Sequence, residues 1–135
     1  MNTKFSNIKL EVIDITTNTS PDIFINNNCI TFTKRVLEDL NYPQNVQFCL
    51  DATNKVFAIR YCKSNEAKAA PFSKQRSEQT SSLSITNKNL RDVILSMIPE
   101  FNNKTRYKVT GEYDIENRVM YFDMSTAQKC NYRSN

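Results

Sequence analysis

Residues 46–61 read Val-Gln-Phe-Cys-Leu-Asp-Ala-Thr-Asn-Lys-Val-Phe-Ala-Ile-Arg-Tyr and predict a β-hairpin. Two runs that alternate apolar and polar residues flank a short loop of Asp, Thr and Asn, which are typical turn residues. Pairing Asp51 with Val56 places six apolar side chains on one face, because side chains alternate along a strand with period two. These six are Val46, Phe48, Leu50, Phe57, Ile59 and Tyr61. The predicted hairpin therefore has one apolar face for a core.

The same hairpin pattern occurs a second time in the chain. Residues 114–119, Asp-Ile-Glu-Asn-Arg-Val, repeat the spelling Asp-x-x-Asn-Lys/Arg-Val of residues 51–56. In the same register, the predicted pairs are Tyr113 with Met120, Gly111 with Phe122 and Val109 with Met124. We therefore expect two hairpins of one design.

Each hairpin follows a strand, a helix cap and an amphipathic helix, so each half of the chain predicts a β-α-β-β unit. A shift of 53 positions, from 33 to 86, aligns Thr33 with Thr86 as helix caps. The hairpins align at a shift of 63, from 51 to 114. One unit cannot cover its own apolar face, but two can close a shared core. We therefore expect internal repeats at about 22–62 and 83–124, related by a pseudo-twofold axis.

The predicted fold class is α+β: a β-rich single domain over residues 1–135, with antiparallel hairpins and two short helices. Further strands are expected at residues 8–15, 22–25, 29–32 and 83–85. The helices are expected to begin after Thr33 and after Thr86 or Asn87, and to end before Pro43 and Pro99. The expected buried residues are Val36, Leu37 and Leu40 in the first helix and Leu90, Val93, Ile94 and Met97 in the second.

Residues 63–82 lack apolar periodicity and predict a mobile linker between the two units. Loops of this length are usually functional or disordered. The segment carries four cations, Lys63, Lys68, Lys74 and Arg76. We interpret it either as a plain connector or as a basic arm that orders on a partner. Residues 128–135 predict a frayed tail.

The composition restricts the chemistry of the chain. It has no histidine, which excludes Ser-His and Cys-His nucleophile pairs and imidazole metal ligands. The single glycine excludes glycine-rich phosphate loops. The cysteines at 29, 49, 62 and 130 lack the short spacing of zinc and redox sites, so we expect inert thiols. Catalysis by two carboxylates stays open, but our expectation is a protein that is not an enzyme and has no cofactor and no metal.

Localisation and charge also narrow the class of partner. No apolar run approaches the roughly 20 residues that cross a bilayer, and the N-terminus lacks the apolar core of a secretory signal. We therefore expect a cytoplasmic protein without a membrane partner. The net charge of +4 permits binding to polyanions, although domains that hold nucleic acid mainly by charge usually have a pI above about 9.

A short pattern runs through the first unit, on Ile30, Phe32, Lys34, Val36, Leu40, Pro43 and Val46. Over residues 22–62, and less clearly over 83–124, the chain resembles the AbrB/MazE swapped-hairpin family. The resemblance implies two units interlocked in one barrel, here within one chain, and DNA binding through basic residues around the hinge helix. The chain departs from the family pattern at three places: Thr33 replaces Pro, no Gly follows Pro43, and Leu37 stands where DNA-binding members commonly carry Arg.

These observations support two classes of function. The first is a nucleic-acid-binding module that uses cations of the helix starts and the linker, namely Lys34, Arg35, Lys63, Lys68, Lys74, Arg76, Lys88 and Arg91. The second is a small protein-binding accessory or inhibitor of a mobile element such as a phage or plasmid, with the linker or a sheet edge as its partner surface. Structural self-assembly is a third reading. We expect a non-enzymatic binding protein whose partner is nucleic acid or a host protein.

Overall fold

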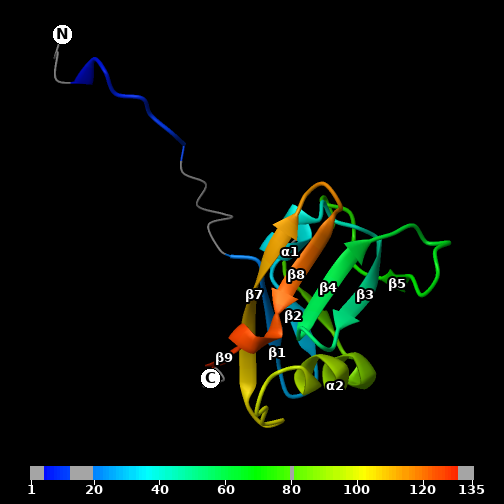
Figure 1. The fold of residues 1–135 in the computed structure, drawn as a ribbon. Helices are drawn as coiled ribbons and strands as arrows, with labels where there is room; N and C mark the ends of the chain where they lie inside the picture. The colour runs from blue at the N-terminus through cyan, green and yellow to red at the C-terminus, as the bar shows by residue number, and fades with distance from the viewer. Residues whose placement is uncertain (1–4, 13–19, 80, 131–135) are drawn as a thin grey trace.

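The computed structural model in Figure 1 describes residues 5–12, 20–79 and 81–130. Its strands are β1 (Asp22–Ile25), β2 (Ile30–Phe32), β3 (Asn45–Asp51), β4 (Val56–Tyr61), β5 (Ala70–Pro71), β6 (Leu83–Ile85), β7 (Arg106–Asp114), β8 (Val119–Asp123) and β9 (Gln128–Cys130). The helices named below are α1 (Lys34–Asp39), α2 (Lys88–Ser96) and the short 3₁₀ helix η2 (Met124–Thr126). Within the described ranges, no helix combines the length and the apolar content of a membrane span.

The strands form one curled antiparallel sheet, which confirms the prediction of a β-rich single domain. Its order is β5-β3-β4-β8-β7-β1-β2-β6, and β9 pairs with β7. The predicted hairpin between β1 and β2 is present, and β6 pairs with β2. Figure 1 shows α1 and α2 at opposite ends of the sheet. This placement follows from the antiparallel pairing of β2 with β6, because each of these strands leads directly into one of the helices.

Both predicted hairpins form in the predicted register. In the β3–β4 hairpin, the pairs are Val46 with Tyr61, Phe48 with Ile59, Leu50 with Phe57 and Asp51 with Val56. In the β7–β8 hairpin, the pairs include Gly111 with Phe122 and Tyr113 with Met120. The predicted pair of Val109 with Met124 is wrong, because β8 ends at Asp123 and Met124 begins η2. The alternation of apolar and polar residues therefore predicts the register of both hairpins, and the one wrong pair lies at the end of β8.

The two hairpin turns are closed by the same side-chain interaction. The carboxylate of Asp51 accepts hydrogen bonds from the backbone and side-chain amides of Asn54, at 3.1 and 2.8 Å. In the second turn, the carboxylate of Asp114 accepts the same two bonds from Asn117, at 3.3 and 2.7 Å. An aspartate that bonds the backbone ahead of it stabilises a tight turn. The repeated Asp-x-x-Asn spelling thus encodes two turns of the same structure.

β7 pairs with different strands along its length, and this gives the sheet its curl. The first half of β7 pairs with β1 and β9, and the second half pairs with β8. Gly111 lies where the pairing changes, and a Cβ atom there would lie 2.7 Å from Cε1 of Phe122 and 2.9 Å from Sδ of Met120. Glycine suits this position because it lets the backbone of β7 approach these core side chains closely, and any larger residue would require them to shift.

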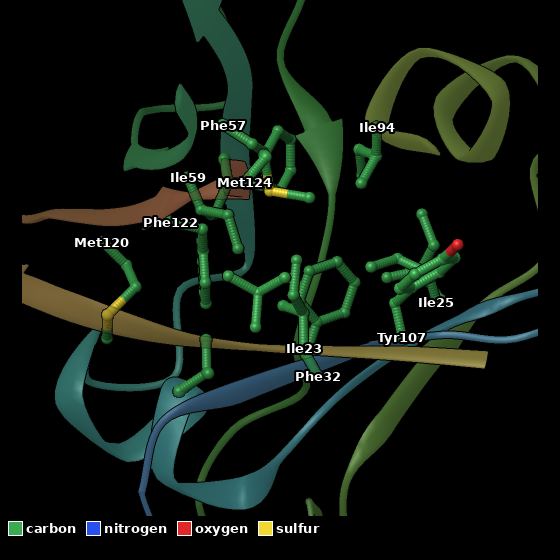
Figure 2. Packing of buried hydrophobic residues seen from close by; sticks show 14 of the residues in the cluster. Ile23, Ile25, Phe32, Phe57, Ile59, Ile94, Tyr107, Met120, Phe122 and Met124 are labelled. Atoms are coloured by element: carbon green, nitrogen blue, oxygen red, sulfur yellow. The ribbon is translucent and has the colours of Figure 1, made fainter. Parts of the chain in front are cut away.

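The curled sheet encloses one apolar core, shown in Figure 2. Its largest fully buried side chains are Phe32, Phe57, Phe122, Ile23, Ile25, Ile30, Leu37, Leu40, Ile59, Ile94, Met120 and Met124. Where β4 pairs with β8, the rings of Phe57 and Phe122 stack with their centroids 6.0 Å apart. Strands from both halves of the chain therefore supply the same interior.

Residues 63–82 contribute an aromatic side chain to this core, although their composition is polar. β5 lies in this segment and pairs with the start of β3. Phe72 is buried, and its ring meets that of Phe32 edge-on with the centroids 5.1 Å apart. The hydroxyl of Ser73 donates a hydrogen bond to the carbonyl of Pro43 at 2.6 Å. A single phenylalanine among polar residues gives no periodic pattern, so the sequence does not predict that Phe72 is buried.

The predicted strand over residues 8–15 is not found in residues 8–12, which form no strand, and residues 13–15 lie outside the described residues. At the other end of the chain, residues 128–130 of the predicted frayed tail form β9 and pair with β7; residues 131–135 lie outside the described residues. Alternation of apolar residues thus predicted a strand at residues 8–12, which pair with no strand among the described residues. The short polar strand β9 was missed because its sequence has no strand pattern and it forms only by pairing with β7.

The buried face of α2 also differs from the prediction. Ile94 and Met97 are buried as expected, but Val93 is 41% exposed, Leu90 is half-buried, and Arg91 is buried instead. Nε and Nη2 of Arg91 donate hydrogen bonds to the carbonyls of Asn26 and Asn103, at 2.6 and 2.9 Å. A charged group can be buried when its donors are satisfied in this way. The helix is therefore oriented by a polar anchor that the apolar pattern did not include.

Replacing Gly111 by Val should lower the free energy of unfolding by about 1–3 kcal/mol, the usual cost of overpacking a core. The added side chain would collide with Phe122 and Met120. Urea denaturation would measure the change. Glu112→Val is the matched control, because Glu112 is the exposed neighbour on the other face of β7. Equal stability of the two variants would contradict the close approach at Gly111.

Replacing Phe72 by Ala should destabilise the domain by roughly 3–5 kcal/mol, because a buried ring is removed and a cavity is left. Phe101→Ala is the control, since the side chain of Phe101 is 45% exposed. Thermal unfolding followed by circular dichroism would compare the two variants. If both lose the same small amount of stability, Phe72 is not a core residue.

Candidate functional site

A hollow of about 480 Å³ opens beside the end of α1. Its walls are residues 41–45, which follow α1, and residues 61–64, which include the end of β4; Gln75 and Arg118 complete the lining. The lining contains two cations, Lys63 and Arg118, several amide side chains, and no carboxylate. A hollow with these groups is suited to bind an anion.

Arg118 reaches this hollow from the turn between β7 and β8. It has a φ of 53°, in the left-handed region, and follows the turn that Asp114 and Asn117 close. Its guanidinium lies 3.7 Å from the centroid of the Tyr61 ring, and Nη2 donates to the carbonyl of Leu40 at 3.0 Å. A guanidinium has five N–H donors, and among the described residues Leu40 is the only acceptor. Arg118 is therefore held in one orientation with donors left for a ligand.

The chain that leaves α1 adopts an unusual backbone conformation in the wall of the hollow. Asn41 and Tyr42 have φ values of 59° and 49°, and Tyr42 is a bulky residue that rarely adopts left-handed backbone. The amide of Tyr42 donates to the carbonyl of Leu37 at 2.8 Å. The guanidinium of Arg76 lies 5.5 Å from the centroid of the Tyr42 ring. Residues of this kind cluster at binding sites, and here the strained turn places the Tyr42 ring beneath a third cation, Arg76, next to the lining residue Gln75.

Two further ionisable side chains, Cys62 and Glu66, lie in or near the hollow. Cys62 lines the hollow but is buried, and this burial raises the pKa of its thiol. A thiol with a raised pKa is a poor nucleophile at neutral pH. The nearby carboxylate of Glu66 accepts a hydrogen bond from the backbone amide of Lys63. The Glu66 carboxylate thus holds the turn that follows β4.

The structure brings one of the eight predicted nucleic-acid contacts into the lining of this hollow and a second against its wall. Lys63 lines it, and Arg76 lies against Tyr42 in its wall. Arg118, which the sequence analysis did not propose, joins them. Arg118 occupies the Lys/Arg position of the repeated turn spelling. Lys55 occupies the same position in the other hairpin and does not line the hollow, so the spelling alone does not identify a site residue.

The other six predicted residues lie elsewhere. Lys34 and Arg35 are half-buried at the start of α1, where Nε of Arg35 lies 2.9 Å from the carboxylate of Asp39. Lys68 and Lys74 are exposed between β4 and β6. Lys88 is exposed at the start of α2, at the opposite end of the sheet from α1, and the buried Arg91 is bonded to backbone carbonyls.

The fold and the hollow define a small β-rich domain with a cationic hollow at one end. No family model matches the chain, and no curated protein or solved structure is similar to it. The AbrB/MazE resemblance therefore stays a prediction from the sequence.

The turn that carries Arg118 should respond to acid. The side-chain and backbone hydrogen bonds from Asn117 lower the pKa of Asp114 below its ordinary value of 3.8. A lowered pKa means that the carboxylate stabilises the fold above the ordinary pKa and that this contribution is lost as the pH falls through the lowered value. Asp114→Asn should therefore be less stable than wild type at neutral pH, and the difference should shrink below a pH of about 4.

Denaturant midpoints measured across this pH range would test the turn. Glu116→Gln is the matched control, since Glu116 is exposed in the same turn and should lose little stability at any pH. The same pH dependence in both variants would show that the Asp114–Asn117 interaction is not the cause.

Proposed function

We propose that this protein is a non-enzymatic nucleic-acid-binding protein and that the hollow beside α1 binds the sugar-phosphate chain. The observation that carries the proposal is that two segments supply cations here: Lys63 and Arg118 line the hollow, and Arg76, from the same segment as Lys63, lies over the ring of Tyr42 in its wall. Arginine and lysine make charge-assisted hydrogen bonds to phosphate. Aromatic rings and guanidinium planes provide surfaces on which unpaired bases stack.

The size of the hollow favours an unpaired strand over a duplex. A volume of about 480 Å³ is within the range of pockets that hold small molecules, and one nucleotide is a ligand of this size. Recognition of single strands depends on nucleotides that are free to leave a stack and enter a protein surface. Amide side chains of Asn41, Gln44 and Asn45 in the lining offer donors and acceptors to a base edge.

We also propose that the two halves of the chain are pseudo-twofold repeats, as the AbrB/MazE resemblance implies. A twofold axis makes contacts reciprocal: if i meets j, the equivalent of j meets the equivalent of i. Thr31 pairs with Ser84, which lies 53 positions later and is its equivalent, and their hydroxyls are 2.9 Å apart. Ala58 pairs with Tyr121, its equivalent at the shift of 63 between the hairpins. Two of the three strand pairings between the halves, β2 with β6 and β4 with β8, are thus centred on equivalent residues.

A reciprocal pair of backbone bonds supports the same axis. The amide of Tyr61 donates to the carbonyl of Arg118 at 3.1 Å, and the amide of Met124 donates to the carbonyl of Lys55 at 2.8 Å. Met124 and Arg118 are the equivalents of Tyr61 and Lys55 at the shift of 63. The side chains differ, because a buried methionine replaces the tyrosine ring that holds Arg118. We therefore expect one binding hollow per chain.

The alternative function is that of a protein-binding accessory or inhibitor of a mobile element. It is favoured by two large apolar side chains that project from connecting segments, Phe101 at 45% and Ile115 at 74% exposure. Affinity purification from the native host would separate the two functions. A stoichiometric protein that is recovered without nucleic acid supports the alternative.

Binding to mixed-sequence single-stranded DNA, single-stranded RNA and duplex DNA, followed by fluorescence anisotropy at two salt concentrations, tests the proposal. Affinity should fall as salt rises, because phosphate contacts release counterions. Arg118→Gln and Lys63→Gln should each weaken binding by roughly tenfold or more, the effect of losing a hydrogen bond to a charged group. Each should also reduce the salt slope by about one.

Lys55→Gln is the matched control. Lys55 has the position of Arg118 in the other hairpin turn, with a φ of 58°, and it does not line the hollow. The Lys55→Gln substitution removes one positive charge, as Arg118→Gln does, and should leave the affinity for nucleic acid nearly unchanged. Absence of binding at low salt, or an equal loss in Lys55→Gln, would contradict the proposal. Thermal unfolding of Arg118→Gln would verify that the variant is folded.

A further inference from the structure

Residues 8–12, Ile-Lys-Leu-Glu-Val, form an extended segment whose apolar side chains are uncovered. Ile8, Leu10 and Val12 are 51%, 92% and 99% exposed. They alternate with Lys9 and Glu11, so an extended backbone places all three apolar side chains on one face. Figure 1 shows the segment away from the sheet. Residues 8–12 therefore have the sequence pattern of a strand, but they pair with no strand among the described residues.

β3 has an open edge that such a strand would complete. β4 pairs with one edge of β3 along its whole length, but β5 covers the other edge only at Asn45 and Val46. Among the described residues, nothing pairs with that edge beyond Val46. An open edge carries free backbone donors and acceptors, and it is the usual place for an added strand.

The open edge of β3 adjoins an apolar hollow of about 250 Å³ between the β3–β4 hairpin and α2. Phe48, Leu50, Leu90 and Val93 contribute to its lining. Leu50 and Val93 are 53% and 41% exposed, so the apolar cover is incomplete at this point. An added strand beside β3 would therefore pair with its open edge and could also cover the exposed apolar side chains of this hollow.

β1, which follows the segment in the chain, begins at the end of the sheet opposite this hollow. β1 begins where α1 begins, since the amide of Asp22 donates to the hydroxyl of Thr33 at 3.0 Å. Leu50 lies near the β3–β4 turn, beside α2. Figure 1 shows α1 and α2 at opposite ends of the sheet. A second copy, related to the first by a twofold axis, can bring its β3 edge to the segment directly.

We propose that residues 8–12 of one copy add as a strand to the β3 edge of a second copy. Ile8, Leu10 and Val12 then face Leu50 and Val93 across the apolar hollow, and Lys9 and Glu11 face solvent. Exchange of identical segments between two copies is reciprocal, so the assembly closes as a dimer. This inference is independent of the proposed nucleic-acid binding.

Light scattering coupled to size-exclusion chromatography tests the exchange on the full chain. Wild type should be dimeric at high protein concentration, and Leu10→Asp and Leu50→Asp should each be monomeric. Two controls should remain dimeric: Glu11→Lys, on the solvent face of the same segment, and Ile115→Asp, at an exposed apolar residue in the other hairpin turn. A monomeric wild type, or a dimer that both Asp variants retain, overturns the proposal.

A disulfide test identifies which copy accepts the segment. Cys49 lies on the face of β3 opposite Phe48 and Leu50, so it should be adjacent to residue 9 or 11 of the added strand. Lys9→Cys or Glu11→Cys should form a covalent dimer on oxidation with diamide, and Cys49→Ser should abolish it. Leu10→Cys, on the other face, should not form it. A disulfide to Cys49 within one chain would overturn the exchange between copies.

Discussion

The pairing of β4 with β8 is the interaction on which the rest of the structure depends. A single two-stranded hairpin is only marginally stable in water, and each half of this chain supplies one. The β4–β8 pairing joins them into a four-stranded sheet with the stacked rings of Phe57 and Phe122 on its inner face. The close approach at Gly111 then lets β7 turn toward β1, and β1 and β2 cover the remaining side of the core.

The candidate site derives its geometry from the same pairing. The amide of Tyr61, at the end of β4, bonds to the carbonyl of Arg118, just before β8. The ring and the guanidinium therefore stack because the two strands meet, and the carbonyl of Leu40 fixes the guanidinium at the end of α1. A change that separates β4 from β8 would therefore displace Tyr61 and Arg118 together with the core rings of Phe57 and Phe122.

The sequence predicts the features that depend on near neighbours. Alternation defines the registers of both hairpins, and the Asp-x-x-Asn spelling defines their turns. Features that depend on distant partners were missed: Phe72 is one ring in a polar segment, β9 exists because β7 is beside it, and Arg91 is buried because two backbone carbonyls accept from it. Lys63 and Arg76 of the site were predicted from charge. Arg118 was missed because its role depends on a tyrosine 57 positions away, from 61 to 118.

The left-handed backbone of this chain has a consequence for tracing its evolution. Among the described residues, six other than glycine have positive φ, namely Asn41, Tyr42, Lys55, Lys68, Glu100 and Arg118. Glycine adopts that backbone without steric cost, so a diverged homologue can acquire glycine at the exposed positions Lys55, Lys68 and Glu100 and keep the fold. Tyr42 differs, because its ring belongs to the core. At position 111 a Cβ atom would crowd Phe122 and Met120. A search profile for remote homologues should therefore score glycine as neutral at the exposed turns and as favoured at position 111.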